Sequence, residues 1–300
     1  MKTIRMNMKF FCSLALAGFI GTSCSKTVTG PPATLPETVM VKAGLSGYEG
    51  QGQALPGETE IKDMQACIFD GGEMVQVFEG LTPSGNTFDL QVNRRSGTLY
   101  LIANTAGLID LKALQEEDVT EDEWLKKSIG LKDNAPVHFF SGSISLDDTP
   151  GPELPVSLRR GIARFDLQIR TAGNAAIDKM TLKNAAGSAY ILPVKGNSSP
   201  DDAARGDVSV TFDTPVTSDA KAVMYAYEQE NIGLEIAIEG TIDGKPVTLS
   251  KAIDGNLDRN KIYTVTVRKD NIDISLEITL DEWETGGDTE LVPASRYSWK

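Results

Sequence analysis

Apolar and polar residues alternate along much of this chain, with the two-residue period of strands that bury one face. Val39–Leu45 places an apolar side chain at every second position, and Ile272–Leu280 does so over nine residues. Short apolar runs bounded by Gly, Asn, Asp or Pro predict further strands at Ala66–Phe69, Met74–Phe78, Phe88–Val92, Thr98–Ala103, Val137–Phe140, Ser143–Leu146, Val156–Arg170, Ala176–Asn184, Tyr190–Pro193, Val208–Phe212, Ala222–Tyr227 and Tyr263–Val267. The pattern therefore predicts an all-β protein.

Two local signals refine this prediction. Asp243-Gly244 lies between two alternating runs and predicts a two-residue hairpin turn. Leu108, Leu111 and Leu114 have helical spacing instead, and Thr120–Glu123 is a capping-box pattern ahead of an apolar pair. We expect one or two short helices between Ile109 and Ile129.

The length of 300 residues suggests two domains. Asp147–Pro155 contains three prolines and a glycine, which favours a boundary there. We expect two β-sandwiches in series, an N-terminal domain at 38–153 and a C-terminal domain at 154–300. Residues 24–37, rich in Ser, Thr, Gly and Pro, read as a flexible tether.

The first 23 residues have the form of an export signal. Three basic residues precede the apolar stretch Phe10–Ile20, which is too short to span a membrane and ends in small residues. We favour lipidation of Cys24, which would then become the mature N-terminus in the membrane. The alternative is ordinary signal cleavage, with Gly21 and Ser23 as the small residues of the site.

Charge and composition narrow the function classes. Loss of the signal removes three basic residues and no acidic one, so the net charge moves from −13 to −16. Nucleic acid is therefore not an expected partner. The single histidine, His138, excludes zinc sites built from several histidines, and we expect it in the core or at a strand edge. Cys67 lies in an apolar run, which favours a buried, unreactive thiol.

Candidate chemistry is sparse. Asp254–Asp258 resembles the start of a calcium loop, but Arg259 stands where glycine is needed, so we expect a polar turn. Arg205, Gly206 and Asp207 form the tripeptide that integrins read, next to an expected loop, and chance is the favoured explanation. No arrangement around His138 resembles a catalytic triad, so we expect no enzyme, cofactor or metal.

Four stretches together resemble the fimbrillins, the lipoprotein-derived type V pilus subunits of Bacteroidetes. They follow the family's order and span most of the mature chain: the lipoprotein-like start ending at Cys24, Met64–Asp70 leading to Gly97–Asn104, Pro155–Asp166 with its Leu-x-Arg pattern, and Asp258–Val265 with its Arg-Asn-x-x-Tyr-x-Val pattern, followed by the terminal strand ending at Trp283.

The resemblance implies two transthyretin-like β-sandwich domains and a non-catalytic subunit of a surface pilus. It implies export as a lipoprotein to the outer membrane, other pilus subunits as partners, and a host or bacterial surface receptor in cell adhesion. Assembly would proceed by strand exchange, in which a neighbour's strand replaces the first strand of a subunit. The displaced strand would carry Val39, Val41, Ala43 and Leu45. The donor would be either the tail Leu291–Lys300 or the strand of Ile272, Ile274, Leu276, Ile278 and Leu280.

One departure keeps the role in the pilus open. Stalk subunits of the family are cut by arginine-specific proteases after the first strand, but this chain has no Arg between Arg5 and Arg94. Lys42 and Lys62 are the nearest basic residues. An uncleaved anchor subunit is therefore an alternative to a stalk or tip subunit. A surface lipoprotein that binds glycans on a β-sandwich is the alternative function.

Overall fold

Strands make up most of the chain in the computed structural model, which describes residues 38–49, 52–85, 87–147, 151–196, 198–269 and 274–280. The expected all-β class is confirmed, with two short helices among the described residues. These residues belong to one compact unit. The division at 153/154 stays a prediction. Cys24, the signal, Ile272 and the tail Leu291–Lys300 lie outside the described residues.

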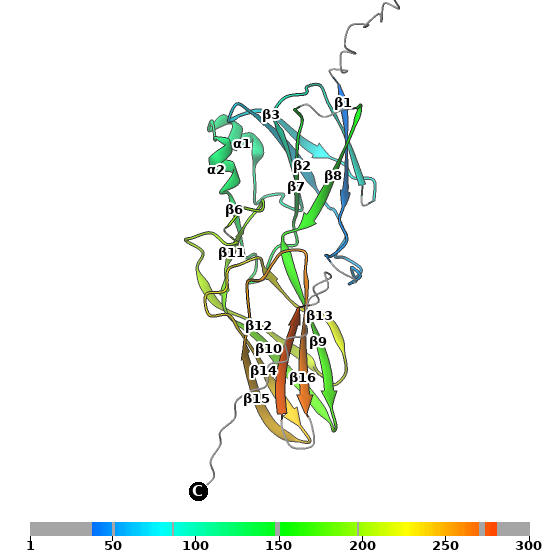
Figure 1. Ribbon diagram of the computed structural model, residues 1–300, viewed down its shortest axis with the longest axis vertical. Helices are drawn as coiled ribbons and strands as arrows, with labels where there is room; N and C mark the ends of the chain where they lie inside the picture. The colour runs from blue at the N-terminus through cyan, green and yellow to red at the C-terminus, as the bar shows by residue number, and fades with distance from the viewer. Residues whose placement is uncertain are drawn as a thin grey trace, which may run out of the picture. The chain divides into compact units, whose positions relative to one another are not determined.

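The first sheet has the strand order β3-β2-β5-β7-β8-β1-β4, and Figure 1 labels β1, β2, β3, β7 and β8 of these strands. Its strands are β1 (Val39–Leu45), β2 (Met64–Asp70), β3 (Glu73–Leu81), β4 (Thr87–Val92), β5 (Thr98–Ala103), β7 (Phe140–Ser145) and β8 (Glu153–Arg160). β7 and β8 pair at Phe140 and Ser141. Apolar residues of β1, β4 and β8 pack with those of β2, β5 and β7 in a single core. The sheet therefore folds over itself.

Two further sheets, called the second pair of sheets below, enclose a core of their own. One sheet has the order β13-β9-β16-β17 and the other β12-β10-β14-β15. The strands are β9 (Ile162–Thr171), β10 (Ala175–Ala186), β12 (Arg205–Val216), β13 (Ala220–Tyr227), β14 (Glu235–Ile242), β15 (Lys245–Ala252), β16 (Ile262–Lys269) and β17 (Ile274–Leu280). The predicted hairpin is confirmed, because β14 and β15 pair on either side of Asp243-Gly244.

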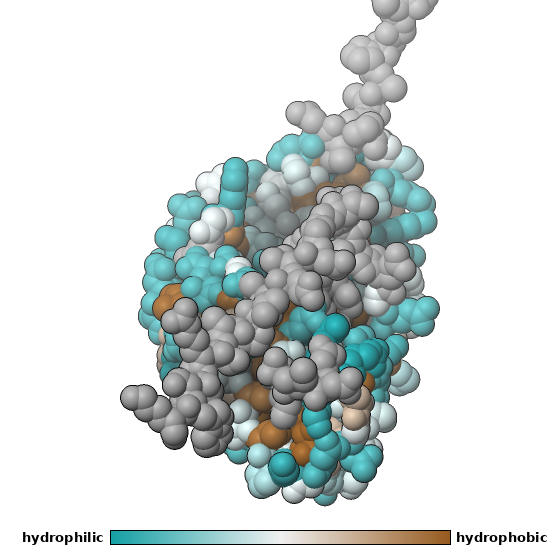
Figure 2. Space-filling model, turned by 60° about the horizontal axis from the view of Figure 1, so that its bottom comes forward, coloured by the Kyte–Doolittle hydropathy of each residue, from teal (hydrophilic) through white to brown (hydrophobic). Residues whose placement is uncertain are grey.

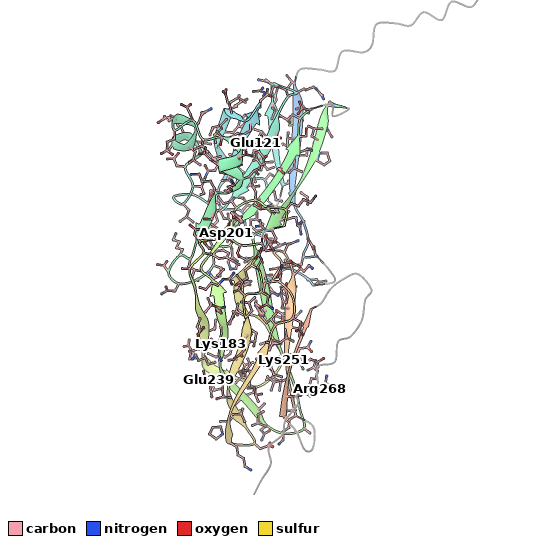
Figure 3. The ribbon with its side chains drawn as sticks, turned by 60° about the vertical axis from the view of Figure 1, so that its left-hand side comes forward. Glu121, Lys183, Asp201, Glu239, Lys251 and Arg268 are labelled. Atoms are coloured by element: carbon pink, nitrogen blue, oxygen red, sulfur yellow. The ribbon has the colours of Figure 1, made fainter. Side chains whose placement is uncertain are left out.

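The helices pack on the other face of β2 and β5. They are α1 (Leu111–Glu116) and α2 (Glu121–Leu125), and a small ladder of β6 (Ser128–Gly130) with β11 (Ser188–Tyr190) lies in the same apolar cluster. The predicted capping box is present at Thr120 and Glu123. Trp124 is 1% exposed and its ring stacks on Phe69. Tyr100 donates a hydrogen bond to Glu121 (2.6 Å), which Figure 3 labels at the start of α2.

Three strand predictions were wrong in their bounds. Val156–Arg170 is two strands, because the chain turns at Gly161, where a β-carbon would lie 1.9 Å from the ring of Phe139. β8 therefore belongs to the first sheet, and the chain enters the second pair of sheets after Gly161. The strand expected over Val137–Phe140 begins only at Phe140. The strand expected over Tyr190–Pro193 ends at Tyr190, because the Ile191 carbonyl accepts hydrogen bonds from the side chains of Arg259 and Ser141.

No helix in the described ranges is long and apolar enough to cross a membrane. On the face drawn in Figure 2, hydrophilic residues predominate, and apolar residues form small separate areas.

Candidate functional site

β1 is bonded to a neighbour along both of its edges. It runs antiparallel to β4 and parallel to β8, with six register pairs on each side. The inward side chains of Val39, Val41 and Ala43 are 1%, 0% and 2% exposed, while Leu45 is half-buried. The predicted strand and its predicted inward face are thus confirmed. Its displacement stays a prediction.

β4 depends on β1 for its place in the sheet. Within the described strands, β4 is the last of the order and bonds to β1 alone. Phe88, Leu90 and Val92 of β4 are nonetheless buried in the first core. Removal of β1 would open a groove with unpaired backbone on both sides and apolar side chains along its floor. Such a groove suits an added strand, because backbone bonds supply affinity and side-chain pockets supply specificity.

The outward face of β1 carries a charged group at its centre. Lys42 lies opposite Asp89 of β4 in the register, and its Nζ is 2.8 Å from a carboxylate oxygen of Glu153 on β8. The hydrogen bond to Glu153 raises the pKa of Lys42, with smaller contributions from the charges of Glu153 and Asp89. A shallow depression of about 740 Å³ runs along this face, between β4 and β8.

The loop that follows β1 is anchored through a buried carboxylate. Glu58 is 4% exposed and accepts hydrogen bonds from Tyr48 (3.0 Å) within the loop and from Tyr225 (2.7 Å) on β13. Arg164 of β9, itself 1% exposed, donates to the same carboxylate at 3.0 Å and also pairs with Asp166. Because Glu58 bonds to residues of β9 and β13, the loop is tied to the second pair of sheets.

Burial and hydrogen bonding act on Glu58 in opposite directions. Burial favours the protonated acid, but hydrogen bonds from the Leu55 amide and Tyr225, the charge of Arg164 and the bond from Tyr48 outweigh it. The pKa of Glu58 is lowered as a result. The carboxylate is therefore ionised at neutral pH and holds the cluster as an anion.

Two residues of the fimbrillin-like patterns hold the loop backbone. Arg160, at the end of β8, donates to the carbonyls of Ser46 (2.9 Å) and Glu58 (3.1 Å). Asn260, from the Arg-Asn-x-x-Tyr pattern, donates to the Gly47 carbonyl at 2.9 Å. Arg160 also bonds to the Asn260 side chain at 3.1 Å. The two patterns, 100 residues apart, thus meet on the loop that follows β1.

The sequence did not single out Tyr48 or Glu58, since the surrounding segment reads as a Gly-rich loop. The one available signal was a large aromatic residue, Tyr48, among glycines and polar residues. The two arginines over its ring, Arg160 and Arg164, lie more than 100 residues away, on strands that only the fold brings near.

β17, the candidate donor, is part of the second core. It pairs with β16 along its whole length, from Ile274 opposite Lys269 to Leu280 opposite Tyr263. Leu276 is 4% exposed, and Ile278 packs against the same core. On the outer face, Arg268 of β16, labelled in Figure 3, pairs with Glu277 at 2.9 Å. The donor role stays a prediction.

Arg205, Gly206 and Asp207 are the first three residues of β12 and follow directly on the loop that ends at Ala204. Gly206 pairs with Ala185 in the ladder, and Asp207 accepts a hydrogen bond from the Asn184 amide. The Arg205 guanidinium bonds to neighbouring loop and strand groups, Ser199 among them. The tripeptide is thus part of a paired strand, and an adhesive role for it stays untested.

The other candidates have structural settings. Cys67 is buried, and burial raises the pKa of its thiol. His138 is half-buried, and its ring meets that of Tyr225 edge-on at 4.3 Å, while burial lowers its pKa. Asp258 of the expected polar turn pairs with Lys261. Among the residues that the structure describes, no group of three or more His, Cys, Asp or Glu could hold a metal ion.

The large apolar side chains exposed in the described ranges are Val75, Leu108 and Ile232, none of them aromatic. Glycan sites on β-sandwiches commonly present aromatic rings. Trp124 is buried, while Trp283 and Trp299 lie outside the described residues. The described part of the chain therefore gives the glycan-binding alternative no support.

No protein-family model and no curated protein matches the sequence. The fold, however, is similar to solved structures. One is the tip fimbrial protein Mfa3 from Porphyromonas gingivalis with a C-terminal truncation, at a TM-score of 0.57 and 14% identity, over 82% of this chain and 100% of that chain. Another is a fimbrial assembly protein from Parabacteroides distasonis, at a TM-score of 0.52 and 14% identity, over 81% and 98%. At this identity, the likeness is one of fold.

Proposed function

We propose that this chain is a fimbrillin-like structural subunit of a cell-surface pilus and is assembled by exchange of β1. The observation that carries the proposal is the place of β1, bonded on both edges and buried on its inward face, yet close to the start of the mature chain. A cut between such a strand and the anchored Glu58 makes the strand replaceable by a strand of another subunit. The likeness in fold to two fimbrial proteins supports the same role.

In this proposal, the chain is exported as a lipoprotein through Cys24 and is attached to the outer membrane until assembly. Its partners are other pilus subunits, and through the pilus it contributes to cell adhesion. The role is structural and involves no catalysis.

The bonds that hold the loop after β1 help to decide which position this subunit takes in the pilus. Lys62, the nearest basic residue after β1, has an exposed side chain. A cut after Lys62 would leave β1, Tyr48 and Glu58 on one fragment, still bonded to Arg160, Arg164 and Asn260. These bonds favour retention of β1 after a cut at Lys62, as in an anchor or terminal subunit, so exchange of β1 requires a cut that separates β1 from Glu58.

The test is the mass of the N-terminal peptide of the protein taken from its native cell surface. A diacylated Cys24 is the result expected of an anchoring or unassembled subunit. A start beyond Leu45 indicates a matured subunit whose groove holds a partner's strand. A protein that stays monomeric after removal of β1 and shows no surface fibres contradicts the proposal.

A further inference from the structure

The position that β1 occupies in the sheet favours a positive charge at its centre. Lys42 is the middle residue of the seven in β1, and its charge lies between two carboxylates of the neighbouring strands, Asp89 and Glu153. Without β1, these two carboxylates would face the groove from opposite sides with no cation between them. A carboxylate on an incoming strand directly opposite Asp89 would be destabilising, whereas a cation there is favourable, so the groove favours a strand that restores the cation.

The groove also requires a small side chain at the position of Ala43, which follows the central cation. Ala43, which follows Lys42, is 2% exposed and faces the first core. A larger side chain there would overpack a filled core. An incoming strand thus needs a small inward residue directly after its central cation.

β17 fails both requirements when it is placed in register with β1. Each strand has seven residues, so the middle residue Glu277 takes the position of Lys42, and Ile278 takes that of Ala43. In its own sheet, Glu277 pairs with Arg268. In the groove it would add a third carboxylate to Asp89 and Glu153.

From this comparison, we infer that the groove is selective for an extended strand with Lys or Arg at its centre, followed by a small residue, and that it disfavours β17 of a second copy. The inference rests on the proposed function and specifies the chemistry of the partner strand. Self-assembly through β17 is then suppressed in favour of a basic donor strand.

The test is strand exchange into the full mature chain, with a site for a sequence-specific protease at Gly52-Gln53, both exposed. After the cut, labelled peptides of Thr38–Glu49 are added, carrying Lys, Gln or Glu at position 42, and entry is followed by fluorescence anisotropy. We expect entry to slow from Lys to Gln to Glu, with about a threefold to tenfold span at low salt that narrows at high salt. A β17 peptide should enter poorly, and its Glu277→Lys version faster.

Matched variants of the protein separate the effect of Asp89 and Glu153 from the effect of the net charge. Asp89→Asn with Glu153→Gln should abolish the preference, whereas Glu73→Gln with Glu79→Gln on β3, which changes the net charge equally, should retain it. Equal entry of the three peptides overturns the inference and leaves strand exchange standing. If even the Lys42 peptide fails to enter, the exchange step of the proposed function falls, and the inference falls with it.

Discussion

The hydroxyl of Tyr225 donates a hydrogen bond of 2.7 Å to the carboxylate of Glu58, across 167 residues of sequence. This bond joins the loop after β1 to β13, a strand of the second pair of sheets. The same carboxylate accepts a hydrogen bond from the guanidinium group of Arg164 at 3.0 Å. The retention of β1 and the integrity of the second pair of sheets are therefore linked at one buried group.

Replacing Glu58 by Gln should lower the free energy of unfolding by about 1–3 kcal/mol, because Arg164 would lose a charged partner in a buried site. Tyr225→Phe removes one hydrogen bond and leaves the ion pair, so a loss of about 0.5–1.5 kcal/mol is expected. Urea denaturation measures both. Equal losses in the two variants would show that the Arg164 contact contributes little.

Stability should also fall at acid pH through Glu58. Because the pKa of Glu58 in the folded chain lies below its ordinary value of 4.5, the unfolded chain binds the proton first as the pH falls. The contribution is complete above about pH 5 and is lost as the pH falls through the folded pKa. Thermal melts between pH 7 and pH 3 should show a shallower decline for Glu58→Gln than for the unaltered chain. Parallel declines would contradict the assignment.

Cleavage at Lys62 should not release β1. A lysine-specific protease should cut this exposed site while Lys42, bonded within β1, is protected. At neutral pH, gel filtration followed by mass spectrometry should find the fragment ending at Lys62 still bound. Glu58→Ala should shed it, while Glu60→Ala, an exposed acid of the same loop, should not. Prompt loss of the fragment from the unaltered chain would refute the anchoring role of the cluster.

Arg259 should be far more important to stability than an exposed arginine. It is 1% exposed, pairs with Glu228 at 2.5 Å and donates to the carbonyls of Tyr190 (2.8 Å) and Ile191 (3.0 Å). Arg259→Ala should cost about 3–5 kcal/mol, because it leaves buried partners without a donor. The exposed pair of Arg268 gives the matched control, since Arg268→Ala should cost about 1 kcal/mol or less. Chemical denaturation of both variants measures the difference.

Cys67 should be inert in the folded chain and reactive once β2 opens. Its thiol is buried and its pKa is raised by burial, so little thiolate is present at neutral pH. In a chain that begins at Ser25, Cys67 is the single thiol. A thiol reagent should label it only in denaturant, and fast labelling of the native chain would contradict the burial of β2.

Local patterns were enough to predict most of the strands. Alternation located β1 and β17, the Asp-Gly pair located the β14–β15 hairpin, and the Thr120 to Glu123 spacing located α2. These signals depend on neighbours within a few residues. The break at Gly161 was missed because the apolar run continues on both sides of it, and only the approach of Phe139 explains the turn.

The contacts that anchor the loop after β1 could not be predicted from local sequence patterns, for a different reason. Arg160, Arg164 and Asn260 belong to family-like patterns, but their partners Gly47 and Glu58 lie in a loop that has no periodicity. The contacts depend on β8, β9, β13 and the residue pair before β16, which come from both halves of the chain. Register, too, was not predictable, so the opposition of Lys42 and Asp89 emerged only with the sheet.

The two ladders of β1 also have a mechanical consequence. Hydrogen bonds in a sheet run across the strands, so a pull along β1 loads its bonds to β4 and β8 in shear and at the same time. A strand at a sheet edge that is peeled sideways gives up its bonds one by one. A partner strand seated where β1 now lies would therefore resist tension along its own length as a unit, which suits a joint in a fibre under load.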